Sequence, residues 1–366
     1  MRVAIVAPLV SAIREPQRGG SQAFLSDLAR GLAARGHEVD LYCASGSDVP
    51  GVRVVDTGVD PRALAATLYK TSGGGASADG LAAADAAFAG VYSALREVPY
   101  DVVHNHAFDA PAISLARRLS APVVHTLHLP PDAAVADALR EVARSDRAPT
   151  VAGVSAAQAR AWRRFVEVDA ILPPLVPTRA IRWSPSAGEG AVFAGRLSPE
   201  KGAIEAIEIA RAAGVRIDVY GDSYDADYTR ERIDPRRADP DVALHRSVPR
   251  TDIWEVMARA AVVLCPARWE EPFGMVAAEA QACGTPVVAF RRGALDEVIL
   301  DGVTGFLVAP DDIGSAAEAV TVAAELSRSR CRDHAERDLD LELSLDAHEQ
   351  LYARAARAGV EVAAGG

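Results

Sequence analysis

Short, continuous apolar runs that alternate with helix-type patterns constrain the fold of this chain more than any other feature. Residues 3–7 are all apolar, residues 24–32 have helical spacing, and a second strand-like segment follows at 38–43. A short run without polar alternation is typical of a strand buried on both faces of a parallel sheet. The order strand, glycine-containing loop, helix and strand therefore predicts a βαβ unit.

The same alternation begins again in the second half of the chain. We expect strands at residues 3–7, 38–43, 101–104, 122–127, 151–155, 191–194, 216–220, 261–265 and 286–290. Pro173, Pro174, Pro177 and the loop at 184–190 interrupt the alternation and predict a hinge. At 366 residues the chain is also too long for one ordinary core. We therefore predict an α/β protein with one Rossmann-like domain at 1–175, a second at 176–344, and a C-terminal helix at 345–366 that could cross back to the first domain.

The composition argues against several classes of protein. A net charge of −11 does not suit a general nucleic-acid binder, which needs a basic face. No apolar run approaches the ~20 residues of a membrane span, and the N-terminal run is too short for a signal peptide. The four cysteines form no Cys-x-x-Cys pair, so reduced thiols and a cytoplasmic location fit best. Arg117-Arg118 and Arg163-Arg164 could mark a patch for peripheral membrane contact, but the acidic net charge favours solvated helix faces. The sequence makes no prediction of an oligomeric state.

Residues 268–284 combine a loop that carries two carboxylates, Glu270 and Glu271, with the start of a short helix. Glu271 comes just before this helix, and Glu279 lies inside it. The first N–H groups of a helix have no partners within it, so they form a ready anion site. Gly274 lacks a Cβ and lets a ligand approach the backbone closely. The candidate ligand-binding residues at this helix start are Phe273, Gly274, Met275 and Val276.

Polar residues also follow several of the expected strands. Ligands of open α/β sheets bind beyond the carboxyl ends of the strands, so Asn105, His106 and His128 are expected at the floor of a cleft. His125 lies at an odd offset from His128 and therefore points to the other face of the strand, and we favour His128 because it falls at the strand end. The pair Gly19 and Gly20 lies where a phosphate or sugar would approach a helix start, although the Gly-x-Gly-x-x-Gly fingerprint of NAD binding is absent.

Taken together, several stretches resemble the retaining glycosyltransferases of family 4. They are Gly19-Gly20, the segment that ends at His128, the loop from Gly195-Arg196 to Lys201-Gly202, the segment Glu271-Pro-Phe-Gly-Met-Val-Ala-Ala-Glu279, and residues 284–288, 293–297 and 301–306. The resemblance covers most of the chain and is dense over 191–308. It implies the GT-B fold, in which two Rossmann-like βαβ domains face each other with a cleft between them.

The resemblance also implies roles for the matched residues. Glu271 corresponds to the glutamate that contacts the hydroxyls of the donor sugar, Glu279 to the one that binds ribose, and His128 to the active-site histidine. Arg196 offers a planar fork and Lys201 a point charge, and both suit a leaving diphosphate. The candidate catalytic residues are thus His128, Glu271, Arg196 and Lys201.

The remaining site residues follow from the same resemblance. The nucleotide base is expected near Gly221 and the stretch 244–249, and the acceptor near Asn105 and His106. The implied substrates are a nucleotide sugar and a small-molecule or glycan acceptor, with UDP favoured on family frequency alone. No cofactor is implied and no metal, since Asp225-Ala-Asp227 is expected to be a solvated loop.

The implied reaction is a front-face displacement with retention. No carboxylate nucleophile of the glycosidase type is evident, so the leaving phosphate is expected to help deprotonate the acceptor while the protein positions the groups and stabilises charge. The alternatives are a nucleotide-sugar epimerase, a phosphorylase or other GT-B nucleotide-sugar enzyme, and a nucleotide-binding protein without activity.

Overall fold

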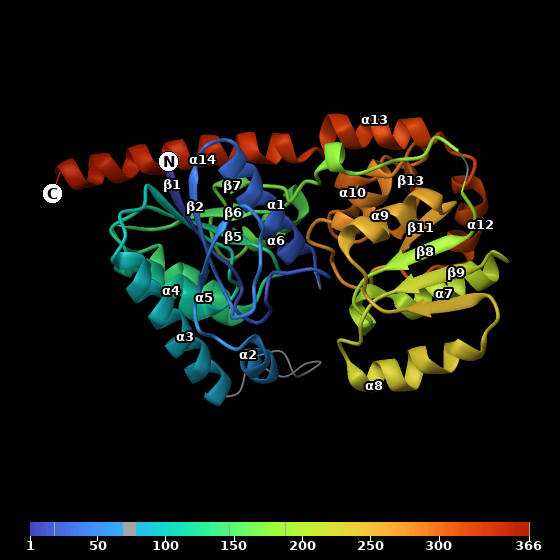
Figure 1. Ribbon diagram of the computed structural model, residues 1–366, viewed down its shortest axis with the longest axis horizontal. Helices are drawn as coiled ribbons and strands as arrows, with labels where there is room; N and C mark the ends of the chain where they lie inside the picture. The colour runs from blue at the N-terminus through green and yellow to red at the C-terminus, as the bar shows by residue number, and fades with distance from the viewer. Residues whose placement is uncertain (18, 69–77, 146, 187, 366) are drawn as a thin grey trace. The chain divides into compact units, whose positions relative to one another are not determined.

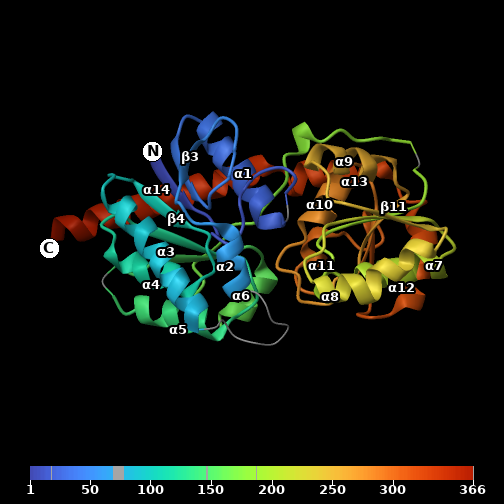
Figure 2. The same ribbon diagram turned by 60° about the horizontal axis from the view of Figure 1, so that its bottom comes forward.

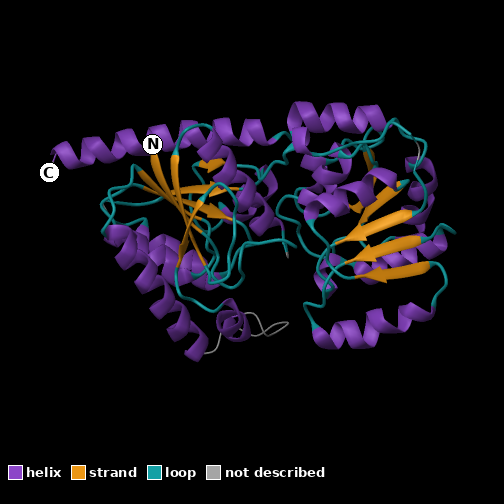
Figure 3. Ribbon diagram, viewed as in Figure 1, coloured by secondary structure: helices purple, strands orange, loops and turns teal. Residues whose placement is uncertain are grey.

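The computed structural model describes residues 1–17, 19–68, 78–145, 147–186 and 188–365 (Figure 1). The chain forms two compact units. The first unit comprises residues 1–14, 21–173 and 344–366, and the second comprises 15–20 and 174–343. Each unit contains its own parallel sheet with helices on both faces (Figure 3).

The first unit is built on seven strands. They are β1 (Arg2–Val6), β2 (Glu38–Cys43), β3 (Arg53–Asp56), β4 (Val102–Asn105), β5 (Val123–Leu127), β6 (Thr150–Gly153) and β7 (Ala170–Ile171). Their order in the sheet is β3-β2-β1-β4-β5-β6-β7, and all neighbours are parallel. The chain builds outward from β1 to one edge and then from β4 to the other. The strand order therefore reverses between β1 and β4, and open α/β sheets bind ligands beyond the carboxyl ends at such a point.

Helices cover both faces of this sheet (Figures 1 and 2). They are α1 (Gly20–Ala34), α2 (Pro61–Leu68), α3 (Ala78–Arg96), α4 (Ala110–Ser114), α5 (Ala133–Val142), α6 (Ala156–Trp162) and α14 (Leu341–Gly365). Phe88 and Tyr92 of α3 join Val103 of β4 in one buried cluster. On the other face α1 meets α14 closely, since a Cβ added to Gly31 would lie 2.7 Å from Leu345. Of the helices in the described ranges, none combines the length and apolar character that crossing a membrane requires.

The second unit repeats the plan with six strands. They are β8 (Ala191–Ala194), β9 (Ile217–Tyr220), β10 (Val242–His245), β11 (Val262–Cys265), β12 (Val287–Phe290) and β13 (Gly305–Val308). Their order is β10-β9-β8-β11-β12-β13, again all parallel, so this sheet reverses between β8 and β11. The loops after β8 and β11 consequently start side by side.

The helices of the second unit pack in two groups. They are α7 (Ala203–Ala212), α8 (Ala226–Tyr228), α9 (Arg250–Arg259), α10 (Met275–Ala282), α11 (Leu295–Val298), α12 (Ile313–Ala323) and α13 (Arg328–Asp338). Ile204 and Ile207 of α7 and Val320 of α12 bury one face of the sheet against Val219 and Phe290. Helices α9, α10 and α13 pack together on the other side (Figure 1).

The predicted α/β fold is confirmed, and the strands missed in the sequence share one property. All nine predicted strands are present, with ends that differ by at most two residues. The missed strands β3, β7, β10 and β13 are the four edge strands of the two sheets. Three of these edge strands contain no buried residue. An edge strand is covered on fewer sides, so it lacks the continuous apolar run by which the central strands were found.

Two left-handed glycines provide a matched test of packing in the second unit. Gly202 (φ 77°) precedes α7, where an added Cβ would lie 2.0 Å from the carbonyl oxygen of Pro266, whereas Gly302 (φ 75°) has no described atom within 4 Å of that position. Both alanine substitutions incur the left-handed backbone cost of about 1–2 kcal/mol, but Gly202→Ala must also displace backbone. We expect Gly202→Ala to lower the free energy of unfolding by about 3 kcal/mol or more, measured by urea denaturation. Equal losses for Gly202→Ala and Gly302→Ala would contradict this account.

Candidate active site

In the second unit, two loops meet where the strand order reverses. The loop after β8 carries Lys201, and the loop after β11 carries Glu271. Lys201 Nζ donates to both carboxylate oxygens of Glu271, at 2.9 and 3.1 Å. The Lys201 side chain is 23% exposed and that of Glu271 is 15% exposed, so the pair is largely shielded from water. The structure thus brings together the lysine predicted for the diphosphate and the glutamate predicted for the donor sugar.

Trp269 and a neighbouring turn hold Glu271 in place. The Trp269 Nε1–H donates to Glu271 Oε2 at 2.7 Å, and Lys201 Nζ lies 4.6 Å from the centre of the Trp269 ring. The carbonyl of Glu271 accepts a hydrogen bond from the Ala294 N–H at 2.8 Å. A Cβ on Gly293 would fall 2.2 Å from that carbonyl oxygen, so only glycine allows this close approach. The carboxylate therefore has a fixed direction.

The helix that follows Glu271 begins at the predicted glycine. Gly274 is the N-cap of α10 with φ 104°, and no side chain caps the helix. Among the described residues, the N–H groups of Met275 and Val276 donate no hydrogen bond. Phe273 is buried at the start of the same helix. The N-terminus of α10 therefore has N–H donors available for an anion.

Glu279 is held by two donors that sequence analysis did not identify. The Glu279 side chain is buried, and its Oε1 accepts from Arg250 Nε and, at 3.1 Å, from Trp254 Nε1. Both donors come from α9, and residues four apart lie on one face of a helix. These contacts fix one carboxylate oxygen of Glu279, and its role toward ribose stays a prediction.

Arg196 lies in the same loop as Lys201 but has other partners. Its guanidinium is 4.5 Å from the centre of the Tyr224 ring and 3.4 Å from Glu200 Oε1. In the described residues no contact joins Arg196 to Glu271. The structure thus places the two predicted phosphate-binding cations on one loop without bringing both to the same carboxylate.

The two stretches predicted to flank the base adjoin one another. The Gly221 N–H donates to the carbonyl of His245 at 3.2 Å. The rings of Tyr220 and His245 stack with centroids 4.3 Å apart. A Cβ on Gly221 would lie 2.0 Å from the carbonyl oxygen of Gly195, so the strand ends approach closely there. Binding of a base at this position stays a prediction.

The predicted glycine pair belongs to the second unit, which includes residues 15–20. A Cβ on Gly20 would lie 3.1 Å from Sδ of Met275, the first residue of α10, whereas Gly19 has no described atom within 4 Å. Gly20 therefore adjoins the helix start that was predicted to hold a phosphate.

In the first unit, the predicted polar residues gather after β4 and β5. His106 Nδ1 and His128 Nε2 are 2.9 Å apart. Asn105 instead donates from its amide to His125 Nδ1 at 2.9 Å. All four side chains are buried, and His128 is the most exposed of them at 9%. The structure brings His106 to His128, while Asn105 is already bonded inside the unit.

His104 and His348 extend this group into a cluster of histidines. The rings of His104 and His106 have centroids 3.8 Å apart. The ring nitrogens of His104 bond the Tyr352 hydroxyl at 2.6 Å and the Thr126 hydroxyl at 2.7 Å. His348, from α14, lies 5.5 Å from His104 between ring centroids. Helix α14 thus supplies two side chains to the carboxyl end of β4.

Burial keeps the histidines of this cluster neutral. It lowers the pKa of His128 and of His348 to about 4, and that of His125 to about 3. It also lowers the pKa of His104 and His106 well below the ordinary value, and repulsion by neighbouring imidazoles acts in the same direction. All five imidazole rings are therefore neutral at neutral pH.

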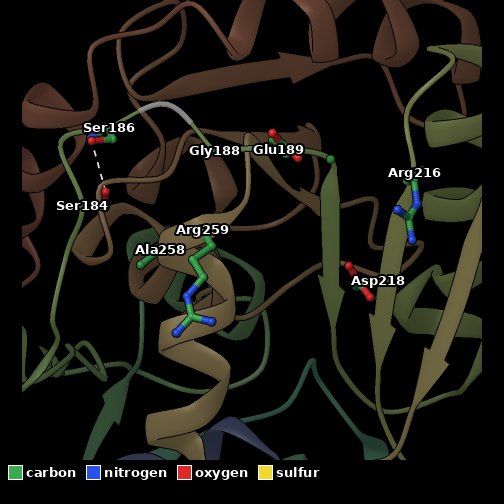
Figure 4. Close-up of a pocket in the computed structure, with 9 residues that line it drawn as sticks. Ser184, Ser186, Gly188, Glu189, Arg216, Asp218, Ala258 and Arg259 are labelled. Atoms are coloured by element: carbon green, nitrogen blue, oxygen red, sulfur yellow. Dashed lines mark hydrogen bonds between the residues drawn. The ribbon is translucent and has the colours of Figure 1, made fainter.

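A pocket of about 490 Å³ lies near the amino ends of strands β8 and β9, away from the loops that carry the predicted site residues (Figure 4). Its lining comes from the loop before β8, from the beginning of β9 and from the end of α9. The lining residues are Ser184, Ser186, Gly188, Glu189, Gly190, Arg216, Asp218, Ala258 and Arg259. None of the predicted site residues lines this pocket, because they follow the carboxyl ends of the strands.

The two carboxylates of the Asp225-Ala-Asp227 segment both have protein partners. Asp225 caps α8 by accepting from the Tyr228 N–H at 2.9 Å, and Asp227 pairs with Arg230 at 2.8 Å. Within the part of the chain that the structure describes, no group of three or more His, Cys, Asp or Glu side chains is arranged to hold a metal ion.

Five important residues were not predicted from the sequence. Trp269 and the α9 pair Arg250 and Trp254 could have been found, the first by its position two residues before Glu271 and the others by their helical spacing. His104 lies in a predicted strand. His348 lies in the predicted C-terminal helix, but nothing in the sequence indicates that its side chain reaches that strand.

Each unit is a parallel α/β sheet, and the second one carries cations, glutamates and a helix start after the carboxyl ends of its strands, which suits an anionic ligand. Comparison with known proteins identifies the family. Residues 184–338 match the family described as Glycosyl transferases group 1, and residues 18–179 match Glycosyltransferase Family 4. A protein from Geodermatophilus obscurus named D-inositol 3-phosphate glycosyltransferase is 31% identical, covering 91% of this chain and 85% of its own. One of the same name from Acidothermus cellulolyticus is 30% identical, covering 87% and 82%. The chain therefore belongs to glycosyltransferase family 4 and is a glycosyltransferase.

Solved structures share the fold. Sucrose-phosphate synthase from Thermosynechococcus elongatus superposes with a TM-score of 0.76 at 19% identity, covering 97% of this chain and 99% of that one. Anabaena HepE, solved in complex with UDP and glucose, has a TM-score of 0.74 at 20% identity, covering 96% and 99%. The predicted GT-B fold class is confirmed.

The buried histidines predict acid sensitivity of the first unit. An unfolded histidine titrates near pH 6.5, but the pKa of His348 is about 4 in the folded chain. The unfolded state therefore binds more protons between these values, and stability falls as the pH falls through this window. We expect His348→Leu to reduce the stability lost between pH 7 and pH 5 by roughly 1–2 kcal/mol, measured by urea denaturation at both pH values. Parallel losses in the variant and the wild type would rule out this contribution.

Proposed function

We propose that this chain is a retaining glycosyltransferase that moves a sugar from a UDP-sugar to an acceptor hydroxyl. The observation that carries the proposal is the contact of Lys201 with Glu271 beside the start of α10. An ammonium group and a helix start both suit phosphate oxygens, while a carboxylate accepts hydrogen bonds from sugar hydroxyls. Such a combination suits a ligand that is anionic at one end and hydroxylated at the other.

Each site residue then has a specific task. Lys201 and Arg196 stabilise the negative charge that develops on the β-phosphate, together with the N–H groups at the start of α10. Glu271 accepts from hydroxyls of the donor sugar, and Glu279 accepts from ribose. His128 of the first unit acts at the donor sugar, as its counterparts in the family do.

The proposed reaction is a front-face displacement. The bond between the anomeric carbon and the β-phosphate oxygen breaks, and its electron pair stays on the phosphate. The acceptor oxygen bonds to the anomeric carbon on the same face, and its proton passes to that phosphate oxygen. Retention then needs no protein nucleophile, and the positive groups of the second unit balance the diphosphate without a metal ion.

Donor, acceptor and location are inferred from the relatives and the composition. UDP is favoured by family frequency, and Anabaena HepE was solved with UDP. The relatives named for D-inositol 3-phosphate make this compound the first acceptor to test. Four free cysteines support a cytoplasmic location.

Turnover assays with neighbouring glutamates test the proposal. The protein is incubated with UDP-sugars, without added metal, and with D-inositol 3-phosphate or water as acceptor, and UDP release is measured. We expect one UDP-sugar to be consumed, and the anomeric proton of the product to show the configuration of the donor by NMR. Glu271→Gln should lower kcat by about 100-fold or more, because the amide has only one acceptor oxygen and lacks the negative charge that Lys201 and the sugar hydroxyls contact.

Glu270 provides the matched control. Its side chain is exposed and accepts from the Gly293 N–H at 2.8 Å, which an amide oxygen can also do. Glu270→Gln should therefore keep the wild-type rate within about twofold. An unchanged rate in Glu271→Gln would refute the site assignment, and an inverted product would refute retention.

A further inference from the structure

One histidine holds another at the carboxyl ends of β4 and β5, and the geometry points to His106 as a positioning residue that fixes the tautomer of His128, with the proton of His128 on Nδ1. The bond joins His106 Nδ1 and His128 Nε2 at 2.9 Å. In a neutral pair, one of these nitrogens donates and the other accepts. The inference rests on the proposed role of His128 at the donor sugar.

The second nitrogen of His106 decides the direction of this bond. His106 Nε2 is buried and has no hydrogen-bond partner among the described residues. If His128 donated, His106 would carry its proton on Nε2, and a buried N–H would have no acceptor. If His106 donates from Nδ1, only an acceptor lone pair stays unused, and buried unpaired acceptors are better tolerated than unpaired N–H groups. His106 is therefore the donor.

Other histidines of the unit show what forces each choice. His348 Nδ1 lies 2.6 Å from the carbonyl of Ser344 and must donate to it, which leaves His348 Nε2 as an unused acceptor. His125 has the opposite arrangement, since the Asn105 amide nitrogen beside its Nδ1 can only donate. His125 therefore carries its proton on Nε2, a buried N–H without an acceptor among the described residues. No neighbour of His106 forces it into this costlier tautomer.

The surroundings of His106 prevent it from turning away. Its ring lies against His104, which the Tyr352 and Thr126 hydroxyls hold from both sides. The Phe24 ring packs edge-on against the His106 ring, with ring centroids 6.3 Å apart. The pair is thus clamped between β4 and the helices of the same unit, and the orientation of His128 follows from that of His106.

The tautomer decides what His128 can do. Its Nδ1 forms no hydrogen bond within the described residues and is not among the buried unpaired atoms, so this nitrogen is accessible from outside. With the proton on Nδ1, His128 presents a neutral N–H donor. It donates a hydrogen bond to an oxygen of the substrate and cannot take a proton as a general base there.

NMR of the wild-type protein tests the tautomer without any activity assay. With ¹⁵N-labelled histidine, the His128 signals are identified by their loss in His128→Gln. We expect a pyrrole-type Nδ1 and a pyridine-type Nε2 in His128, unchanged between pH 5.5 and 8 (about one unit or more above its pKa of about 4). A pyrrole-type Nε2 would overturn the inference, and the proposed transferase function would be unaffected.

Two variants of His106 separate positioning from packing. In His106→Asn the amide nitrogen takes the place of Nδ1 and can donate to His128, whereas His106→Leu removes the donor. We expect His106→Leu to give mixed His128 tautomers and to lower kcat/KM at least about tenfold, and His106→Asn to restore both. As a control, His125→Leu alters an equally buried ring and should leave the His128 tautomer unchanged. A pure Nδ1–H form of His128 in His106→Leu would overturn the role of His106.

Discussion

Parallel pairing of all strands is the constraint on which both candidate sites depend. When every strand of a sheet runs the same way, the loops that follow the strands collect at one edge, and two of them adjoin where the strand order reverses. In the second unit this brings Lys201 to Glu271, which is 70 residues away in the chain. In the first unit the neighbouring parallel strands β4 and β5 end side by side, which brings His106 to His128. The topology of each unit thus decides which segments of the chain meet, and the side chains on those segments then supply the chemistry.

The pair of Lys201 and Glu271 is costly unless it is well supported. Two largely shielded charges lose hydration, and their attraction offsets this loss only with good geometry and further hydrogen bonds. Trp269 supplies such a bond to the carboxylate and an aromatic face to the ammonium group. A lysine has three donors, so Lys201 can keep its contact with Glu271 and still bind a phosphate oxygen. Charges fixed in this way need little rearrangement when negative charge develops on a leaving group.

The sequence allowed the centre of each sheet to be predicted, but not its edges. Strands such as β8 and β12 are buried on both faces and read as short apolar runs, whereas β3 and β10 are half-exposed edge strands without that pattern. Arg196, Lys201, Glu271 and Glu279 of the second unit were identified because they lie in short motifs, whereas Arg250 lies in no such motif and was missed. His348 could not be identified in this way, since it reaches β4 only through the return of α14 to the first unit.

Calorimetric titration with UDP and UMP tests the central claim, which is that the loops after β8 and β11 hold the diphosphate of a nucleotide. If Lys201 binds the β-phosphate, Lys201→Met should weaken UDP binding about tenfold or more and leave UMP binding within about twofold, because UMP lacks that phosphate. Equal loss of affinity for UDP and UMP would show that Lys201 acts only through the structure of the loop. Unchanged UDP binding in Lys201→Met would contradict the account directly.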